Sequence, residues 1–394
     1  MNNGKNTNAA RALAMGVVAA LFIVSLQGTG AALSNSGGGS WQYYKEITIS
    51  YSGGALSDYQ VLVQLSSSNF PTNARSDGAD VRFTDNNGNE LSYWIESWDY
   101  SGRSAKIWVK VPSIVGGGGA IIRMHYGNPS ASSSSNGDAT FEFFDDFMGT
   151  SLDTTNKWSY NGQGSIAVSN SILSMTGWTP YIYSNKLFNV TQNILESKVK
   201  EPGISNTALP GWMGDSGVTS SDVRAQYYHG YPGFEGAVWY VYDGTGRVAS
   251  RSVLYDNYNI LGIRIINSTL VDFYKDYSKV FSFSSLSQFL VGNSIAGMQT
   301  QLSGYSMYID WVRVRKIASS EPTLTLGAEQ PIVPPTTVPP TTVPPTIATA
   351  TTTPTYTATP TPTSKPSVSL HGDKTDVVLG EDIILKLSAL NLIC

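Results

Sequence analysis

Alternation of apolar and polar residues with a period of two runs through much of this chain. In residues 47–51, isoleucine and tyrosine alternate with threonine and serine, and residues 59–65 and 107–111 repeat the pattern. Such alternation is typical of a half-buried β-strand, because successive side chains of a strand point to opposite faces. No stretch of sufficient length shows the apolar stripe of an amphipathic helix. The sequence therefore predicts an all-β protein.

The low content of charged residues supports this prediction. Charged residues make up 14% of the chain, compared with about a quarter of an average soluble domain. Long helices need lysine, glutamate and arginine to cover their solvent faces, so they are not expected here. The formal net charge is −4 and no basic stripe is present to neutralise phosphates, which argues against a nucleic-acid partner.

Residues 1–32 are typical of an export signal. Lys5 and Arg11 precede an uncharged apolar run, and small residues follow that run. The pattern predicts a cleaved signal peptide, and the alternative is an uncleaved membrane anchor, since residues 12–33 are long enough to cross a bilayer of about 30 Å. Both interpretations predict a protein that is secreted or held at the cell surface or envelope. The single cysteine, Cys394, excludes disulfides within the chain.

Four motifs in series mark the first domain, which is expected at residues 41–140. They lie at residues 75–84, 93–98, 107–112 and 124–129. Glycine-rich turn signals separate the predicted strands, which is typical of a β-sandwich. Through these motifs the segment resembles the extracellular family catalogued as domain of unknown function 2341. The resemblance implies a module of the cell envelope, and it implies no particular activity.

The second domain is expected at residues 141–330, as another β-sandwich of the jelly-roll type. Its opening residues 144–147, 151–153 and 157–158 resemble the opening of concanavalin A-like and laminin-G-like domains, and residues 309–315 resemble their closing strand. The resemblance implies that the first and last strands of this domain lie side by side. It also implies that Asp145 or Asp146 comes close to Asp310.

Asp145, Asp146 and Asp310 are therefore the candidate metal ligands. Calcium prefers several oxygen ligands, and carboxylates from the first and last strands with backbone carbonyls would supply them. Because similar jelly rolls hold a structural cation there, the sequence predicts structural Ca²⁺ and no other cofactor. The alternative is that Asp145 caps a turn and Asp310 accepts a hydrogen bond from a neighbouring strand.

A catalytic role is not expected for the second domain. Jelly-roll glycosidases place two glutamates two or four residues apart along one strand face, and the corresponding Glu-x-Asp-x-Glu spacing is absent from this block. Glu196 and Glu201 are five residues apart, which places them on opposite strand faces. The prediction is a protein that is not an enzyme, and a jelly-roll glycoside hydrolase stays open as an alternative.

An aromatic cluster in the second domain is the candidate ligand-binding surface. Sugar rings stack their C–H faces on aromatic planes, and nearby polar groups orient the sugar hydroxyls. The candidate residues are Tyr227, Tyr228, Tyr231, Trp239, Tyr240, Tyr242 and Asp243. The alternative is that these aromatic residues simply suit strands and cross-strand pairs. The predicted function is non-catalytic recognition of a cell-surface or extracellular glycan or surface, and the alternative is a structural spacer or adhesion scaffold without a ligand.

The last part of the chain changes composition abruptly. Residues 331–366 are rich in proline and threonine and contain a Val-Pro-Pro-Thr-Thr repeat, which predicts a disordered linker that favours polyproline II. Residues 367–394 resemble the first two strands of an immunoglobulin-like domain. Two strands do not form a stable sandwich, so an incomplete segment is expected. Membrane association would come from the N-terminal segment or from an anchor beyond this point.

Overall fold

The computed structural model describes most of the chain between residues 39 and 332. The described residues are 33–34, 39–178, 180–200, 207–214, 224–229, 237–242, 247–252, 257–284, 292–300 and 306–332. They belong to one of the two units into which the chain divides, and residues 336–394 form the other, which lies outside the described part. The predicted signal segment, nearly all of the predicted linker and the predicted immunoglobulin-like segment therefore lie outside the described residues.

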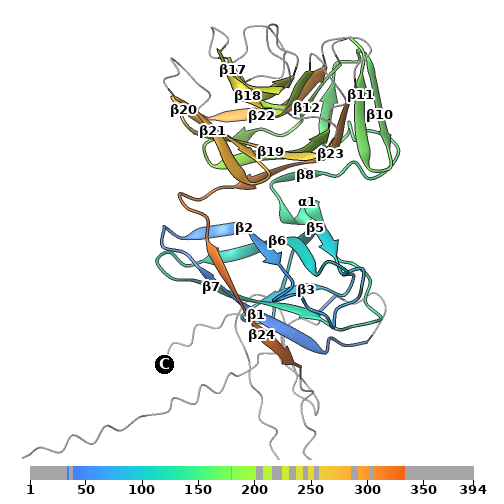
Figure 1. Cartoon of the computed structure of the whole chain (residues 1–394), viewed down its shortest axis with the longest axis vertical. Helices are drawn as coiled ribbons and strands as arrows, with labels where there is room; N and C mark the ends of the chain where they lie inside the picture. The colour runs from blue at the N-terminus through green and yellow to red at the C-terminus, as the bar shows by residue number, and fades with distance from the viewer. Residues whose placement is uncertain are drawn as a thin grey trace, which may run out of the picture. The chain divides into compact units, whose positions relative to one another are not determined.

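The described residues are almost entirely β-strand, which confirms the predicted all-β class (Figure 1). They contain one short α-helix, α1 (Gly137–Thr140), whose N-cap Asn136 accepts a hydrogen bond from the backbone of Ala139. None of the described helical structure is both long and apolar enough to span a membrane. The strands build two sandwiches, and α1 lies in the chain between them.

The first sandwich packs a five-stranded sheet against a three-stranded sheet. The larger sheet has the order β24 (Thr323–Pro331), β1 (Tyr43–Ser50), β7 (Gly119–Tyr126), β3 (Arg82–Asp85), β4 (Glu90–Leu91). The smaller sheet has the order β2 (Leu56–Leu65), β6 (Ser104–Ile114), β5 (Tyr93–Asp99). The inward side chains of both sheets, such as Ile47, Val63 and Ile107, form one buried core.

The edge strand of the larger sheet, β24, comes from the far end of the described chain. It pairs with β1 in antiparallel register from Tyr43–Pro331 to Ser50–Thr323, and its leucines Leu324 and Leu326 pack against the first core. The expected second domain, residues 141–330, includes this strand, whereas the structure places it in the first sandwich. The second sandwich is therefore inserted between β7 and β24 of the first.

The second sandwich packs two large antiparallel sheets face to face. One has the order β10 (Ser165–Ser169), β11 (Ile172–Thr176), β23 (Ser306–Lys316), β14 (Asn193–Lys200), β19 (Asn259–Asn267), β20 (Leu270–Lys275), β21 (Ser278–Ser284), with β8 (Phe143–Asp145) also paired to β23. The other has the order β18 (Arg247–Ser252), β17 (Ala237–Tyr242), β16 (Arg224–His229), β15 (Thr207–Met213), β22 (Asn293–Thr300), β12 (Tyr181–Ser184), β9 (Trp158–Tyr160), with β13 (Phe188–Asn189) paired to β22. The pairing of β8 with β23 confirms that the first and last strands of this sandwich lie side by side.

Alternation along β14 separates a core face from an outer face. Leu195 and Val199 lie in the buried core, as their period of two predicts, so Glu196, Lys198 and Lys200 face the other side of the sheet. The outer face of this sheet carries the charged and aromatic groups described below.

A β-bulge changes the alternation on the neighbouring strand β23. Trp311 lies opposite Lys198 and Ile309 lies opposite Val199, so one extra residue, Asp310, interrupts the pairing. Ile309 and Val312 therefore both face the core, although they are three residues apart. The bulge directs Arg313 to the outer face of the sheet.

A buried cluster of aromatic rings joins the two sandwiches. Its members are Trp94 and Trp108 of the first sandwich, Phe141 and Phe144 of the connecting segment, and Trp311 of the second sandwich. The rings of Trp94 and Phe144 meet edge to face at a centroid distance of 4.8 Å, and those of Trp94 and Trp311 at 5.7 Å. Because all five rings are buried, the sandwiches share an interface that resembles a hydrophobic core.

A guanidinium group is enclosed by this cluster. The Arg313 side chain has 0% exposure and lies 4.3 Å from the ring centroid of Trp108. Its Nε donates to Glu196 of the second sandwich at 2.8 Å, and its Nη1 donates to Glu96 of the first at 3.0 Å. Burial opposes ionisation of Glu196, but the guanidinium groups of Arg315 and Arg313 outweigh burial and lower the pKa of this carboxyl. A charged network therefore crosses the interface.

His125 on β7 gives the first sandwich a measurable pH dependence. Burial, reinforced by the positive charge of Arg123, lowers the pKa of His125 to about 4, whereas the unfolded chain returns it to the ordinary value near 6.5. Between these values the unfolded chain binds a proton that the folded chain does not bind. We therefore expect this contribution to stability to be complete above about pH 6.5 and lost as the pH falls toward 4, by on the order of 3 kcal/mol.

Urea unfolding followed by tryptophan fluorescence between pH 7 and pH 4 measures this dependence. His125→Gln retains a polar group beside Thr84, which lies 3.0 Å from the imidazole Nε2, and removes the titration. The variant should therefore lose stability less steeply than the wild type as the pH falls. Parallel profiles for the two proteins would contradict the assignment.

Candidate functional site

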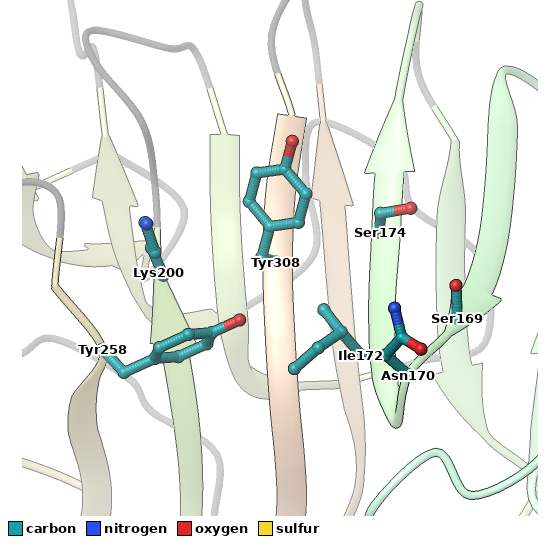
Figure 2. Close-up of a pocket in the computed structure, with 7 residues that line it drawn as sticks. All are labelled: Ser169, Asn170, Ile172, Ser174, Lys200, Tyr258 and Tyr308. Atoms are coloured by element: carbon teal, nitrogen blue, oxygen red, sulfur yellow. The ribbon is translucent and has the colours of Figure 1, made fainter.

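An open groove crosses the outer face of the sheet that contains β11, β23 and β14. It has a volume of about 480 Å³ and is lined by Ser169, Asn170, Ile172, Ser174, Lys200, Tyr258 and Tyr308. Figure 2 shows Tyr308 on β23 between the residues of β10 and β11 on one side and Lys200 and Tyr258 on the other. The groove therefore depends on the hairpin β10–β11, on β23 and on β14, which are distant in sequence and adjacent in the sheet.

A tight turn forms the polar side of the groove. Ser169 pairs with Ile172, so only Asn170 and Ser171 connect β10 and β11. Both residues have positive φ, 53° and 57°, as a type I′ turn requires, and asparagine tolerates this conformation better than most residues. The turn places Asn170 and Ser169 in the lining of the groove.

Two tyrosines form the aromatic side of the groove. Tyr258 is 37% exposed, and Lys198 Nζ lies 5.4 Å from its ring centroid. Partial burial, together with the Asp310 carboxylate and Tyr308, raises the pKa of Tyr258, so its hydroxyl stays protonated and able to donate at neutral pH. Tyr308 is partly buried on β23 and adds a second ring.

Two lysines of β14 lie at or near the groove, and they differ in their partners among the described residues. Lys198 forms an ion pair with Asp310 at 2.6 Å. Lys200, two residues further along β14, lines the groove and has no ion-pair partner among the described residues. The groove thus combines aromatic rings, hydroxyl and amide groups, and one ammonium donor.

The structure places one candidate sugar-binding residue in the core. Tyr227 has 0% exposure, packs edge to face with Phe273 at 5.4 Å, and donates its hydroxyl to the Tyr274 carbonyl oxygen at 2.6 Å. It is therefore a core residue, as the alternative interpretation predicted for strand aromatics. The backbones of Tyr228, Trp239, Tyr240 and Tyr242 belong to β16 and β17, but their side chains lie outside the described part. Tyr231 and Asp243 also lie outside the described residues.

The candidate calcium ligands are held by other partners. Asp145 accepts hydrogen bonds from Trp158 Nε1 at 2.6 Å and from the Phe147 backbone at 2.9 Å, while Asp310 is paired with Lys198. Asp145 lies opposite Val312, whose side chain is in the core, and Asp310 projects from the bulge beside the groove. Asp146 is partly exposed.

Within the described residues, no group of three or more acidic, histidine or cysteine side chains is arranged to hold a metal. The contacts of Asp145 and Asp310 match the alternative stated for them, a turn cap and a partner on a neighbouring strand. Structural Ca²⁺ at these residues stays a prediction.

The groove residues carry only a weak signal in the sequence. Alternation along β14 places Lys200 on the outer face, but Tyr258 and Tyr308 reach the groove only because β14, β23 and β19 are neighbours in the sheet. Strand order is set by tertiary packing, so a single sequence does not reveal that these residues meet.

Comparison with solved structures finds similar proteins at low identity. An uncharacterized protein from Mycobacterium paratuberculosis is 16% identical, covering 44% of this chain and 99% of that chain, with a TM-score of 0.37. An immunostimulatory antigen and pseudo beta-1,3-glucanase of Mycobacterium tuberculosis is 15% identical, covering 45% and 99%, with a TM-score of 0.37. An endo-beta-1,3-glucanase from Pyrococcus furiosus is 12% identical, covering 46% and 95%, with a TM-score of 0.33. Nothing about activity follows from similarity at this level.

In the sequence comparisons, one family model matches part of the chain. No curated protein matches the chain. Residues 77–161 match the family described as Domain of unknown function (DUF2341). The matched segment begins in the first sandwich, passes through α1 and β8, and ends just after β9 of the second sandwich. Residues 77–161 are therefore similar to this family, and the similarity spans the junction between the sandwiches.

Proposed function

We propose that this chain is an exported, non-catalytic protein of the cell surface or envelope that recognises carbohydrate. The groove lined by Tyr258, Tyr308, Lys200 and the turn at Asn170 is the observation that carries the proposal. The export-signal pattern of residues 1–32 supports a location outside the membrane.

The chemistry of the groove suits a sugar ring. The apolar C–H face of a hexose stacks on a tyrosine plane, while its hydroxyls exchange hydrogen bonds with serine, tyrosine and amide groups and accept from an ammonium. A volume of 480 Å³ lies within the usual range for ligand sites, about 300–1,000 Å³. An open groove also leaves both ends of a polysaccharide chain free to continue beyond the site.

The acidic groups near the groove support binding without hydrolysis. Retaining glycosidases need two carboxyl groups about 5 Å apart. The described lining of the groove contains no carboxylate, Asp310 beside it is paired with Lys198, and Glu196 on the same face is held by two arginines. These carboxylates are committed to structural contacts.

Binding of the full chain to a glycan array and to immobilised polysaccharides tests the proposal. We expect retention on at least one polysaccharide, and at least about fivefold weaker binding for the double variant Tyr258→Ala/Tyr308→Ala, since ring contacts of this kind contribute roughly 0.5–1.5 kcal/mol each. Trp178→Ala is the matched control, because this side chain is 63% exposed and does not line the groove.

Other outcomes of the same assay identify the alternatives. If no glycan retains the protein, the spacer interpretation replaces the proposal. Release of reducing sugar would instead show a glycoside hydrolase. Equal loss of binding in Trp178→Ala and in the double variant would exclude the groove as the binding site.

A further inference from the structure

A second cavity lies where the two sandwiches meet. Its volume is about 250 Å³. Leu62 and Trp108 of the first sandwich, with Leu324 of β24, form one side, and Ile194, Arg264 and Arg315 of the second sandwich form the other. Neither sandwich encloses this space alone, so the cavity exists only in the joined pair.

Most polar groups around the cavity already have partners. Arg315 donates to Glu196 through Nε and Nη2 and to Glu321 through Nη1. Tyr277 donates its hydroxyl to Glu96 and accepts from Arg313 at 3.0 Å. These groups balance one another within the interface network, and they need no ligand.

Arg264 is the exception among the cavity residues. Its Nη2 donates to the Ala318 carbonyl oxygen at 2.9 Å, but its Nε is buried and has no hydrogen-bond partner among the described residues. Asp272 lies opposite it on β20 and is instead bonded to Ser282 and paired with Lys279. Glu196 and Glu321 also line the cavity, and both are bound by Arg315. A buried donor without an acceptor is unfavourable.

We propose that the cavity binds a small monocarboxylic acid with a compact apolar body. The carboxylate accepts from Arg264, because a charge-assisted bond satisfies the free N–H of its Nε. The body lies between the aliphatic side chains of Leu62, Ile194 and Leu324 and the ring of Trp108. A volume of 250 Å³ equals the space of about eight waters at about 30 Å³ each, which suits a molecule the size of benzoate.

Such a ligand would contact both sandwiches at once. A molecule that binds the folded chain and not the unfolded chain raises the unfolding temperature. Because the cavity needs both sandwiches, binding should also strengthen their association. The proposal is independent of carbohydrate binding, since the groove and the cavity have no lining residue in common.

Thermal unfolding and calorimetric titration of the full chain with benzoate, hexanoate, acetate and benzyl alcohol test the proposal. Benzoate and hexanoate are expected to raise the unfolding temperature by roughly 2 to 4 °C near saturation. Acetate lacks the apolar body and benzyl alcohol lacks the charge, so neither should produce this shift. An equal shift with benzyl alcohol, or no shift with either larger acid, would overturn the proposal.

Two variants show whether the effect arises in the cavity. Arg264→Gln should abolish the benzoate shift, and Arg123→Gln, a partly exposed arginine that does not line the cavity, should retain it. Leu62→Phe fills the cavity while leaving Arg264 in place, and it should also abolish the shift. Survival of the full shift in either cavity variant would show that benzoate binds elsewhere.

Discussion

Replacing Arg313 with methionine is expected to destabilise the joined sandwiches by about 3–5 kcal/mol, the usual cost of breaking a buried ion pair by removing one partner. The change leaves the Glu96 carboxylate buried without its guanidinium partner and removes one of the two arginines that bind Glu196. Methionine fills much of the space of the arginine stem, so the loss arises from the uncompensated charge more than from a cavity. Urea unfolding followed by tryptophan fluorescence measures the effect, because Trp94 and Trp311 report on the interface.

Three further variants separate the charge effect from general damage. Arg123→Met removes the exposed pair with Glu46, which is 3.7 Å long, and should cost less than about 1 kcal/mol. Arg313→Lys should not restore full stability, because an ammonium lacks the planar fork that reaches Glu96 and Glu196 together. Adding Glu96→Gln to Arg313→Met should recover part of the loss. If Arg313→Met costs no more than Arg123→Met, the network does not hold the sandwiches together.

Ending the chain after Ala318 is expected to prevent stable folding of the first sandwich. This change removes β24, with its backbone pairing to β1 and the contacts of Leu324 and Leu326 with the core. It also removes the carboxylates that accept hydrogen bonds from two buried tyrosines, Glu321 for Tyr59 and Glu329 for Tyr126. The combined loss is expected to be comparable to the whole stability of a domain, about 5–15 kcal/mol.

Limited proteolysis and heteronuclear NMR of the shortened chain measure this effect. A chain ended after Ile332 is the matched control, because it retains β24 and loses only residues outside the described part. The control should match the full chain in protease resistance through residues 39–332. A protected first sandwich in the chain ended after Ala318 would show that β24 is dispensable.

The position of β24 in the first sandwich also determines which shorter segments are expected to fold. A segment cut at the expected boundary, residues 41–140, lacks β24 and should not fold alone. The DUF2341 match at residues 77–161 likewise contains four of the five rings of the interface cluster and omits Trp311. We therefore expect the folding unit to be larger than either segment.

Period-two alternation was sufficient to predict several of the strands. It separates Leu195 and Val199 from the charged residues of β14, and the structure places these two sets on opposite faces, with Leu195 and Val199 in the core. The adjacency of β8 and β23 followed from the resemblance of their sequences to opening and closing jelly-roll strands. These predictions succeeded because they depend on residues that are close in sequence or on a fold that is already known.

The partner of β24 and the bulge at Asp310 could not be predicted in this way. Residues 323–326 alternate threonine and leucine, which indicates a strand but does not say which sheet it joins. The bulge at Asp310 moves its carboxylate away from the position that a regular strand would give it. Both features are decided by tertiary packing.

The burial of the charged residues could not be predicted from the sequence either. Arg313 and Glu96 are separated by 217 residues, and each alone is typical of a solvated surface. Tyr227 illustrates the opposite case, because an aromatic residue that suggested a binding surface proved to be buried. A single sequence shows which residues are polar or aromatic but not which distant residues will cover them.

The pairing of β1 with β24 has a mechanical consequence. The chain enters this unit beside the point where it leaves, since Tyr43 lies opposite Pro331 and the Ile332 backbone donates to Gln42 at 2.8 Å. Tension applied between residues 42 and 332 would break the hydrogen bonds between the two strands one after another, starting from the pair Tyr43–Pro331. Until that ladder opened, the second sandwich would carry no load. The pair β1–β24 therefore carries the load, and the first element to yield under force is β24, the strand that completes the first sandwich.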